Sequence, residues 1–319
     1  MDLPAETQMR WVLRRMATLM RLGAEPVRGL VLPNGTFFPD RFDGSPPALQ
    51  LLLARIQDHA GLGDLDAELR IVTPEGEQVG GGCGSGACGP GGKLDVRIDR
   101  VARDEHGHYQ VTVGTGEVRH PTILTTALVR SVASMFLSEV GGYEELDEAE
   151  REPVTDLAAV MLGFGVLVAN GSYIYMKGCG SVQVHSATRL PVAEAALALA
   201  IYCALHGEPA RSAAKHLEVT PRELFDEASV WATSNAATVR LLRKDAELVE
   251  DDEFTLGPAR GWLGRLFAAK RKSTAVPTSD ELAELERALG EAPAATPRTA
   301  RDPKRAQRLA EIKGLLDEA

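Results

Sequence analysis

Two carboxylates one helical turn apart are the residues of this sequence with the clearest potential for chemistry. Glu152 and Asp156 stand four positions apart, so they share one face of any helix that contains both. A carboxylate can ligate zinc, and a second carboxylate nearby can orient a metal-bound histidine. Carboxylates are also common in the first turn of a helix, where the helix dipole favours negative charge. The spacing alone therefore leaves both a metal site and an ordinary helix start open.

The residues that follow these carboxylates resemble a bacterial family of gluzincin-like zinc metallopeptidase-like proteins. The run EPVTDLAAVMLGFGVLVANG, from Glu152 to Gly171, is similar to the second half of the family's motif, an E-x-L-T-D-L segment followed by an apolar run. The resemblance is specific over residues 120–205 and loose elsewhere. It implies a zincin-like helical region in which Glu152 stands at the third metal ligand and Asp156 at the residue that orients a histidine.

The helix that should supply the other ligands departs from the family's pattern. In gluzincins an H-E-x-x-H helix carries two histidine ligands and a glutamate base. In the same register, this sequence has Arg130 at the position of the first histidine, Ser131 at that of the glutamate base and Ser134 at that of the second histidine. Because a catalytic zinc needs three protein ligands, we expect no metal at this site and no peptidase activity. Instead, Arg130 or Ser134 should lie within hydrogen-bond reach of Glu152 or Asp156, and a charge pair there would hold the two helices together.

Two other segments suggest different functions. Cys83 and Cys88, in the glycine-rich loop Gly80–Gly92, have a spacing that a metal site permits, and with scattered histidines they would make the chain a metal-dependent hydrolase. No second Cys/His pair lies near them in sequence, so two incidental thiols in a loop are the simpler interpretation. The segment Ala213–Leu224 has the cadence of a helix-turn-helix regulator. Acidic residues such as Glu223 in its second helix would face phosphates unfavourably.

The overall composition is that of a globular protein with net negative charge. The 319-residue chain has 44% hydrophobic and 25% charged residues and a formal net charge of −10, which argues against nucleic acid or an anionic membrane as partners. Arginines interrupt the apolar residues near the N-terminus, so no secretory signal is predicted. The longest apolar run, from Leu157 to Ala169, is too short to span a bilayer. We expect a cytoplasmic protein without a cofactor, whose partner is another protein.

The elements that position these residues are predicted to form an α+β fold. Residues 1–119 should combine helices with a small antiparallel-type sheet, with helices over 6–22 and from 46 to near 61 and strands over 29–32, 67–72, 94–101 and 109–113. Residues 120–270 read as almost wholly helical, with helices over 121–140, 153–169, 191–206, 210–216 and 221–242. Residues 271–319 read as a flexible linker and a helical tail with little core of its own.

Overall fold

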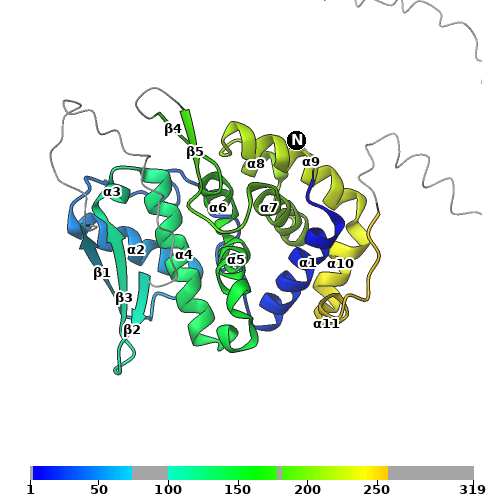
Figure 1. Cartoon of the computed structure of the whole chain (residues 1–319), viewed down its shortest axis with the longest axis horizontal. Helices are drawn as coiled ribbons and strands as arrows, with labels where there is room; N and C mark the ends of the chain where they lie inside the picture. Colours follow the sequence, from blue (N-terminus) through cyan, green and yellow to red (C-terminus); the bar gives the residue numbers. More distant parts are fainter. Residues whose placement is uncertain (1–2, 74–99, 178–181, 258–319) are drawn as a thin grey trace, which may run out of the picture. The chain divides into compact units, whose positions relative to one another are not determined.

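The computed structural model describes residues 3–73, 100–177 and 182–257 of the chain. Helices and a small sheet together form the described part, which confirms the predicted α+β class (Figure 1). By its contacts the chain divides into one compact unit from Met1 to Arg265 and a second from Leu266 to Ala319. Every described residue belongs to the first unit. The predicted tail, residues 271–319, and the glycine-rich loop Gly80–Gly92 lie outside the described residues.

The larger of the two sheets has three strands and is mixed. β3 (Tyr109–Gly114) is central, and β2 (Val101–Arg103) pairs with it in antiparallel orientation. Most of the strand predicted over 94–101 lies outside the described residues. β1 (Ala67–Val72) pairs with β3 in parallel, so the expectation of an antiparallel-type sheet is wrong for this strand. The long connection between β1 and β3 allows the chain to return to the same end of the sheet, as a parallel pair requires. One face of β3 is buried, through Tyr109, Val111 and Val113.

The helices confirm most of the pattern that the sequence predicts. α1 (Glu6–Arg21) and α2 (Pro46–Ala60) are present, and Ser45 caps α2 by accepting a hydrogen bond from the amide of Ala48. The helices that follow are α3 (Thr115–Val118), α4 (Pro121–Glu139), α5 (Glu148–Ala159), α6 (Gly165–Gly171), α7 (Val192–His206), α8 (Ala210–Ala214), α9 (Val219–Ser234), α10 (Ala236–Lys244) and α11 (Ala246–Glu250).

The helix that carries the two carboxylates begins earlier than predicted. We expected a helix from Pro153 to Ala169, but α5 begins at Glu148, and Pro153 lies inside it. Glu152 and Asp156 are therefore not in the first turn of their helix. The interpretation of these carboxylates as an ordinary helix start, where the dipole favours them, does not apply to this position.

A π-helical turn, Val160–Phe164, separates α5 from α6, because another backbone segment packs against it. Gly163 in this turn has a φ of +100°, which favours glycine. A Cβ atom at this position would lie 2.4 Å from the carbonyl oxygen of Gly29, and the amide of Val31 donates to the carbonyl oxygen of Gly163 at 2.9 Å. The predicted strand over 29–32 is absent because this segment bonds to the helical turn instead of to a strand.

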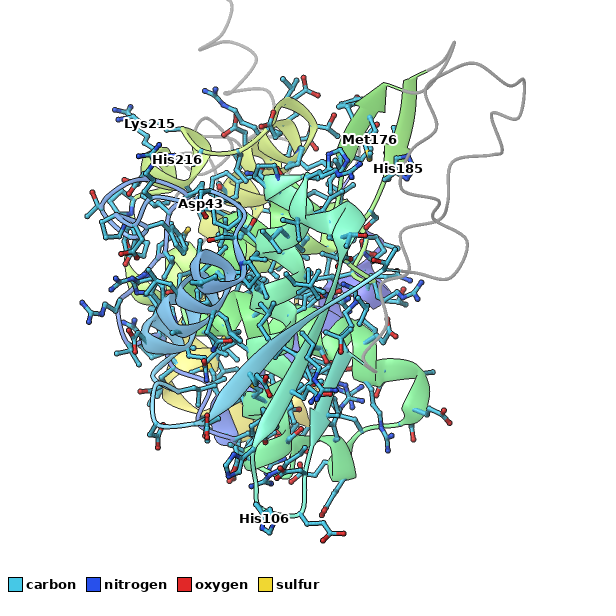
Figure 2. All side chains as sticks on the ribbon, turned by 90° about the vertical axis from the view of Figure 1, so that its left-hand side faces the viewer. Asp43, His106, Met176, His185, Lys215 and His216 are labelled. Carbon is cyan, nitrogen blue, oxygen red and sulfur yellow. The ribbon has the colours of Figure 1, made fainter. Side chains whose placement is uncertain are left out.

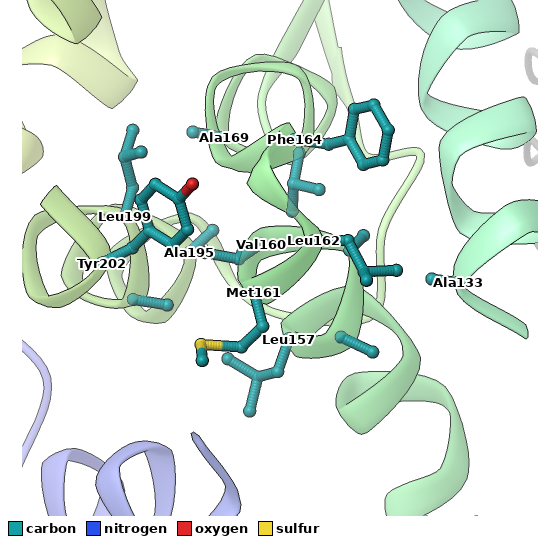
Figure 3. Close-up of a cluster of buried hydrophobic side chains, with 14 of the residues drawn as sticks. Ala133, Leu157, Val160, Met161, Leu162, Phe164, Ala169, Ala195, Leu199 and Tyr202 are labelled. Carbon is teal, nitrogen blue, oxygen red and sulfur yellow. The ribbon is translucent and has the colours of Figure 1, made fainter. Parts of the chain in front are cut away.

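The chain from α5 to α6 forms the centre of the hydrophobic core. Figure 3 shows Leu157, Met161 and Phe164 from this stretch, with Ala133 of α4 and Leu199 of α7 beside it. α4 and the stretch Glu148–Gly171 are long and apolar enough to cross a membrane by length and composition. In the described fold, however, 78% of the apolar window in α4 and all of the apolar window in Glu148–Gly171 are buried.

Two strands interrupt the region that was expected to be almost wholly helical. β4 (Ile174–Lys177) and β5 (Val182–His185) form an antiparallel hairpin that extends from α6 (Figure 1). The first strand, Ile174–Lys177, does not alternate between apolar and polar residues, and the alternation in Val182–His185 covers only four residues. The sequence pattern therefore missed the hairpin.

The predicted helix over 221–242 is two helices, α9 and α10, which separate at Asn235. The side-chain amide of Asn235 donates to the carbonyl oxygen of Gly257 at 3.0 Å, and its side-chain oxygen accepts from the amide of Gly257 at 2.7 Å. Asparagine competes for backbone groups in this way and so favours helix ends over helix interiors. These two hydrogen bonds hold the segment that follows α11 against the junction between α9 and α10.

Candidate functional site

α4 and α5 bring the predicted site residues to one helix interface. α4 carries Arg130, Ser131 and Ser134, which are all buried. α5 carries Asp156, which has no exposed surface, and Glu152, whose side chain is 25% exposed. The spacing of four places both carboxylates on the face of α5 that meets Arg130. The site is therefore an interhelical contact, deep at Asp156 and open to solvent at Glu152.

A buried salt bridge joins the two helices. Nε of Arg130 donates to Oδ1 of Asp156 at 2.5 Å, and the Arg130 side chain is 6% exposed. Nη2 of Arg130 lies 3.7 Å from Oε2 of Glu152. The predicted hydrogen-bond contact between these helices is therefore confirmed. Removing one partner of such a pair leaves a charge buried without compensation, which makes the pair a structural requirement of this interface.

The second oxygen of Asp156 holds the loop that precedes α7. Oδ2 accepts hydrogen bonds from the backbone amides of Arg189 at 2.7 Å and Leu190 at 2.8 Å. Burial raises the pKa of the Asp156 carboxyl, while Arg130 and these two amides act in the opposite direction. One carboxylate thus connects α4, α5 and the approach to α7, and each of its oxygens has a donor.

Glu152 pairs with an arginine that no sequence motif marks. Nε of Arg189 lies 2.5 Å from Oε2 of Glu152, and the Arg189 side chain is 51% exposed. Arg189 stands 37 residues further along the chain, in a loop, so only the fold brings it to this carboxylate. With Arg130 on the other side, Glu152 faces two guanidinium groups. Neither carboxylate of the predicted site is therefore free to act as a base.

The two serines make local hydrogen bonds and do not contact the carboxylates. Ser131 donates to the carbonyl oxygen of Ala127 within α4. The Ser134 hydroxyl accepts from the hydroxyl of Tyr143 at 3.0 Å, and the Tyr143 oxygen lies 2.9 Å from Oγ1 of Thr155. Tyr143 and Thr155 were not predicted as site residues, since nothing in their spacing distinguishes them from core residues. The hydroxyls form a chain of polar contacts that links the same two helices.

A small cavity lies beside the salt bridge. Its volume is about 20 Å³, and its lining includes Arg130, Ser134 and Thr155. Arg100 and Glu117 also line it, and Nη1 of Arg100 donates to both Glu117 oxygens at 2.5 and 2.7 Å. Such a volume has room for about one water molecule. The interface therefore cannot admit a peptide without a rearrangement of α4 and α5.

The histidines that the structure describes do not gather at this interface. Figure 2 shows His106 at the turn after β2, His185 on β5 and His216 after α8, widely separated from one another. Among the described residues, no group of three or more His, Cys, Asp or Glu side chains could hold a metal ion. Cys83 and Cys88, the ligands of the alternative metal site, lie outside the described residues.

The predicted helix-turn-helix segment, Ala213–Leu224, spans the end of α8 and the start of α9. The exposed face of α9 carries the acidic residues Glu223, Asp226 and Glu227. Negative charge on a recognition helix would repel the phosphates of DNA. The geometry of this hairpin therefore gives no support to a DNA-binding function.

No family model matches the chain, and comparisons with curated proteins and with solved structures also gave no match. Function is therefore argued from the α4–α5 interface itself. In this interface an arginine and an aspartate form a buried salt bridge between two core helices.

Proposed function

We propose that this chain is a metallopeptidase-like protein without catalytic activity, which acts in the cytoplasm as a binding or structural module for another protein. The observation that carries this proposal is the buried salt bridge between Arg130 and Asp156. Arg130 stands where the sequence resemblance implies a first histidine ligand. Arginine is always protonated and has no lone pair to offer, so it cannot replace histidine as a ligand of zinc.

The salt bridge would take over the structural part of the metal's role. A structural or catalytic metal fixes the elements that supply its ligands. Arg130 and Asp156 join α4 to α5, and Asp156 also holds the amides of Arg189 and Leu190 before α7. The elements that a zinc ion would connect are thus connected by charge and hydrogen bonds. The fold can keep its helix arrangement without the ion.

The same contacts argue against peptide hydrolysis at this interface. A general base must reach the proton that it removes, directly or through one water molecule. Ser131, at the position of the base, is a hydroxyl that donates to its own helix, and Glu152 and Asp156 are both paired with arginines. The cavity of about 20 Å³ beside them is too small for a substrate.

The proposal is tested by the metal content and peptidase activity of the full chain purified without chelator. We expect no stoichiometric zinc by elemental mass spectrometry and no cleavage of casein or of a peptide library. The Glu152→Gln variant should behave in the same way, because Glu152 ligates nothing. One equivalent of tightly held zinc that is lost together with activity in Glu152→Gln would overturn the proposal.

A further inference from the structure

A second pocket lies between the loop 33–42, α2 and the first turn of α4, and it shares no lining residue with the cavity beside Arg130. Its volume is about 320 Å³, within the range of sites for small molecules. Most of the lining is apolar, contributed by Pro33, Phe38, Phe42, Ala48, Leu52, Pro121 and Leu124. The pocket thus has the size and the apolar lining that a small organic ligand requires.

The loop that forms one wall of this pocket is held in place by several contacts. The side-chain oxygen of Asn34 accepts a hydrogen bond from the amide of Thr36 at 2.9 Å. The backbone carbonyl oxygen of Asn34 accepts one from the amide of Phe38, also at 2.9 Å. Nε2 of His59, on α2, lies 2.8 Å from the carbonyl oxygen of Phe37. The ring of Phe38 packs edge-on against His59. A wall fixed in this way is already shaped for a ligand, so binding loses little entropy in ordering it.

The loop is also held by an ion pair, and a second arginine, from the loop itself, lines the pocket. Nε and Nη2 of Arg55 donate to Oδ2 of Asp40 at 3.0 and 2.9 Å, so the carboxylate in the lining is neutralised. The carboxylate of Asp43, labelled in Figure 2, accepts a hydrogen bond from the amide of Ser45 at 2.9 Å. Arg41 lines the pocket and has no ion-pair or hydrogen-bond partner in the part of the chain that the structure describes.

The first turn of α4 adds to the positive potential at the pocket. Pro121, Leu124 and Thr125 of this turn belong to the lining, and the turn contains no acidic residue. The N-terminal end of a helix carries a partial positive charge. Together with the guanidinium of Arg41, it favours a negatively charged group on a ligand whose remaining surface is apolar.

We propose that this pocket binds a monocarboxylic acid with an apolar body. The apolar body would lie against Phe38, Phe42 and Leu52, and the carboxylate would pair with Arg41. This inference is independent of the function proposed for the α4–α5 interface, since the two sites have no residue in common.

Octanoate, octanol and octylamine, used as probes with the full chain, separate the apolar from the charged contribution. We expect saturable binding of octanoate by titration calorimetry, with weaker binding of octanol and weaker still of octylamine. Arg41→Gln should weaken octanoate binding about tenfold and leave octanol unchanged, because it removes a charged hydrogen-bond donor. Phe42→Ala should weaken both. Arg222→Gln, an exposed arginine on α9, is the matched control and should change neither.

Several results would overturn this proposal. Octylamine binding as tightly as octanoate would show that the pocket does not select a carboxylate. Equal octanoate affinity in Arg41→Gln and Arg222→Gln would place the ligand elsewhere. An absence of saturable octanoate binding would also count against it, including the case in which another part of the chain or a second copy already fills the pocket.

Discussion

Arg130 is a charged side chain that the protein keeps almost wholly out of water, and its effect on stability depends on its partner. Arg130→Met should lower the free energy of unfolding by about 3–5 kcal/mol, because Asp156 then remains buried without a cation. Urea unfolding measures this. Arg189→Gln removes a pair whose arginine is half exposed and should cost about 1 kcal/mol or less. A loss in Arg130→Met no larger than that in Arg189→Gln would contradict the structural role of the salt bridge.

His206 should make the stability of the protein depend on pH. Burial lowers the pKa of His206, nearby Arg243 lowers it further, and Glu208 and Glu25 oppose them. The unfolded chain takes up this proton near pH 6.5, whereas the folded chain takes it up only at lower pH. The stability that neutral His206 contributes to the fold is therefore fully present above about pH 6.5. It is lost as the pH falls towards the lower pKa of His206 in the folded chain.

His206→Leu should reduce this loss of stability in acid. Unfolding of both proteins is compared at pH 7.5 and pH 5.5, and the wild type should lose more free energy of unfolding between the two values than the variant does. An equal loss in both proteins would show that other groups account for the pH dependence.

The residues of the site differ in how far the sequence could predict them. The contact of Arg130 with the α5 carboxylates follows from helical spacing and the register of two helices. Arg189 and Tyr143 reach the same interface from outside the two helices, and no local pattern encodes that approach. The start of α5 at Glu148 was missed because Pro153 reads as a helix start, although here it lies inside the helix.

At the scale of elements, long helices were easier to predict than interruptions and short strands. The structure places α1, α2 and α4 within about one residue of their predicted bounds, and α2 and α4 have proline in the first turn. The π-helical turn at Gly163 depends on a contact with the distant segment at Val31, which a local pattern does not contain, and the strands of the β4–β5 hairpin are only four residues long. The parallel pairing of β1 with β3 is of the same kind.

The contact between the π-helical turn and the loop at Gly29 can be tested at Gly163. Gly163→Ala should destabilise the protein by on the order of 3 kcal/mol, because the new Cβ would lie 2.4 Å from a backbone oxygen at a φ of +100°. Gly23→Ala is the control, since Gly23 also has a positive φ, of +86°, but has open space at its Cβ. It should cost only about 1–2 kcal/mol. Equal losses of thermal stability in the two variants would show that the close contact between Gly163 and Gly29 does not contribute to stability.

At the scale of the whole molecule, the described core should be stable without the C-terminal segment. Residues 273–319 include the linker Glu291–Pro303, which is rich in Ala, Pro and Thr and offers little to bury. A chain that ends before Ser273 should therefore melt within about 4 °C of the full chain, a difference of roughly 1 kcal/mol. Thermal unfolding followed by circular dichroism measures this. A decrease of many degrees would show that the segment belongs to the core.

We propose that the α4–α5 interface has the arrangement of a zinc-peptidase site, with Arg130 at the position of a ligand. Introducing the residues of the gluzincin motif with Arg130→His, Ser131→Glu and Ser134→His should then give a chain that takes up one zinc ion, with Glu152 as the third protein ligand. Adding Glu152→Gln should greatly weaken that uptake, and the wild type should bind no zinc. Zinc uptake is measured by equilibrium dialysis, with circular dichroism to show that each variant is folded. A folded triple variant that takes up no zinc would contradict the claim.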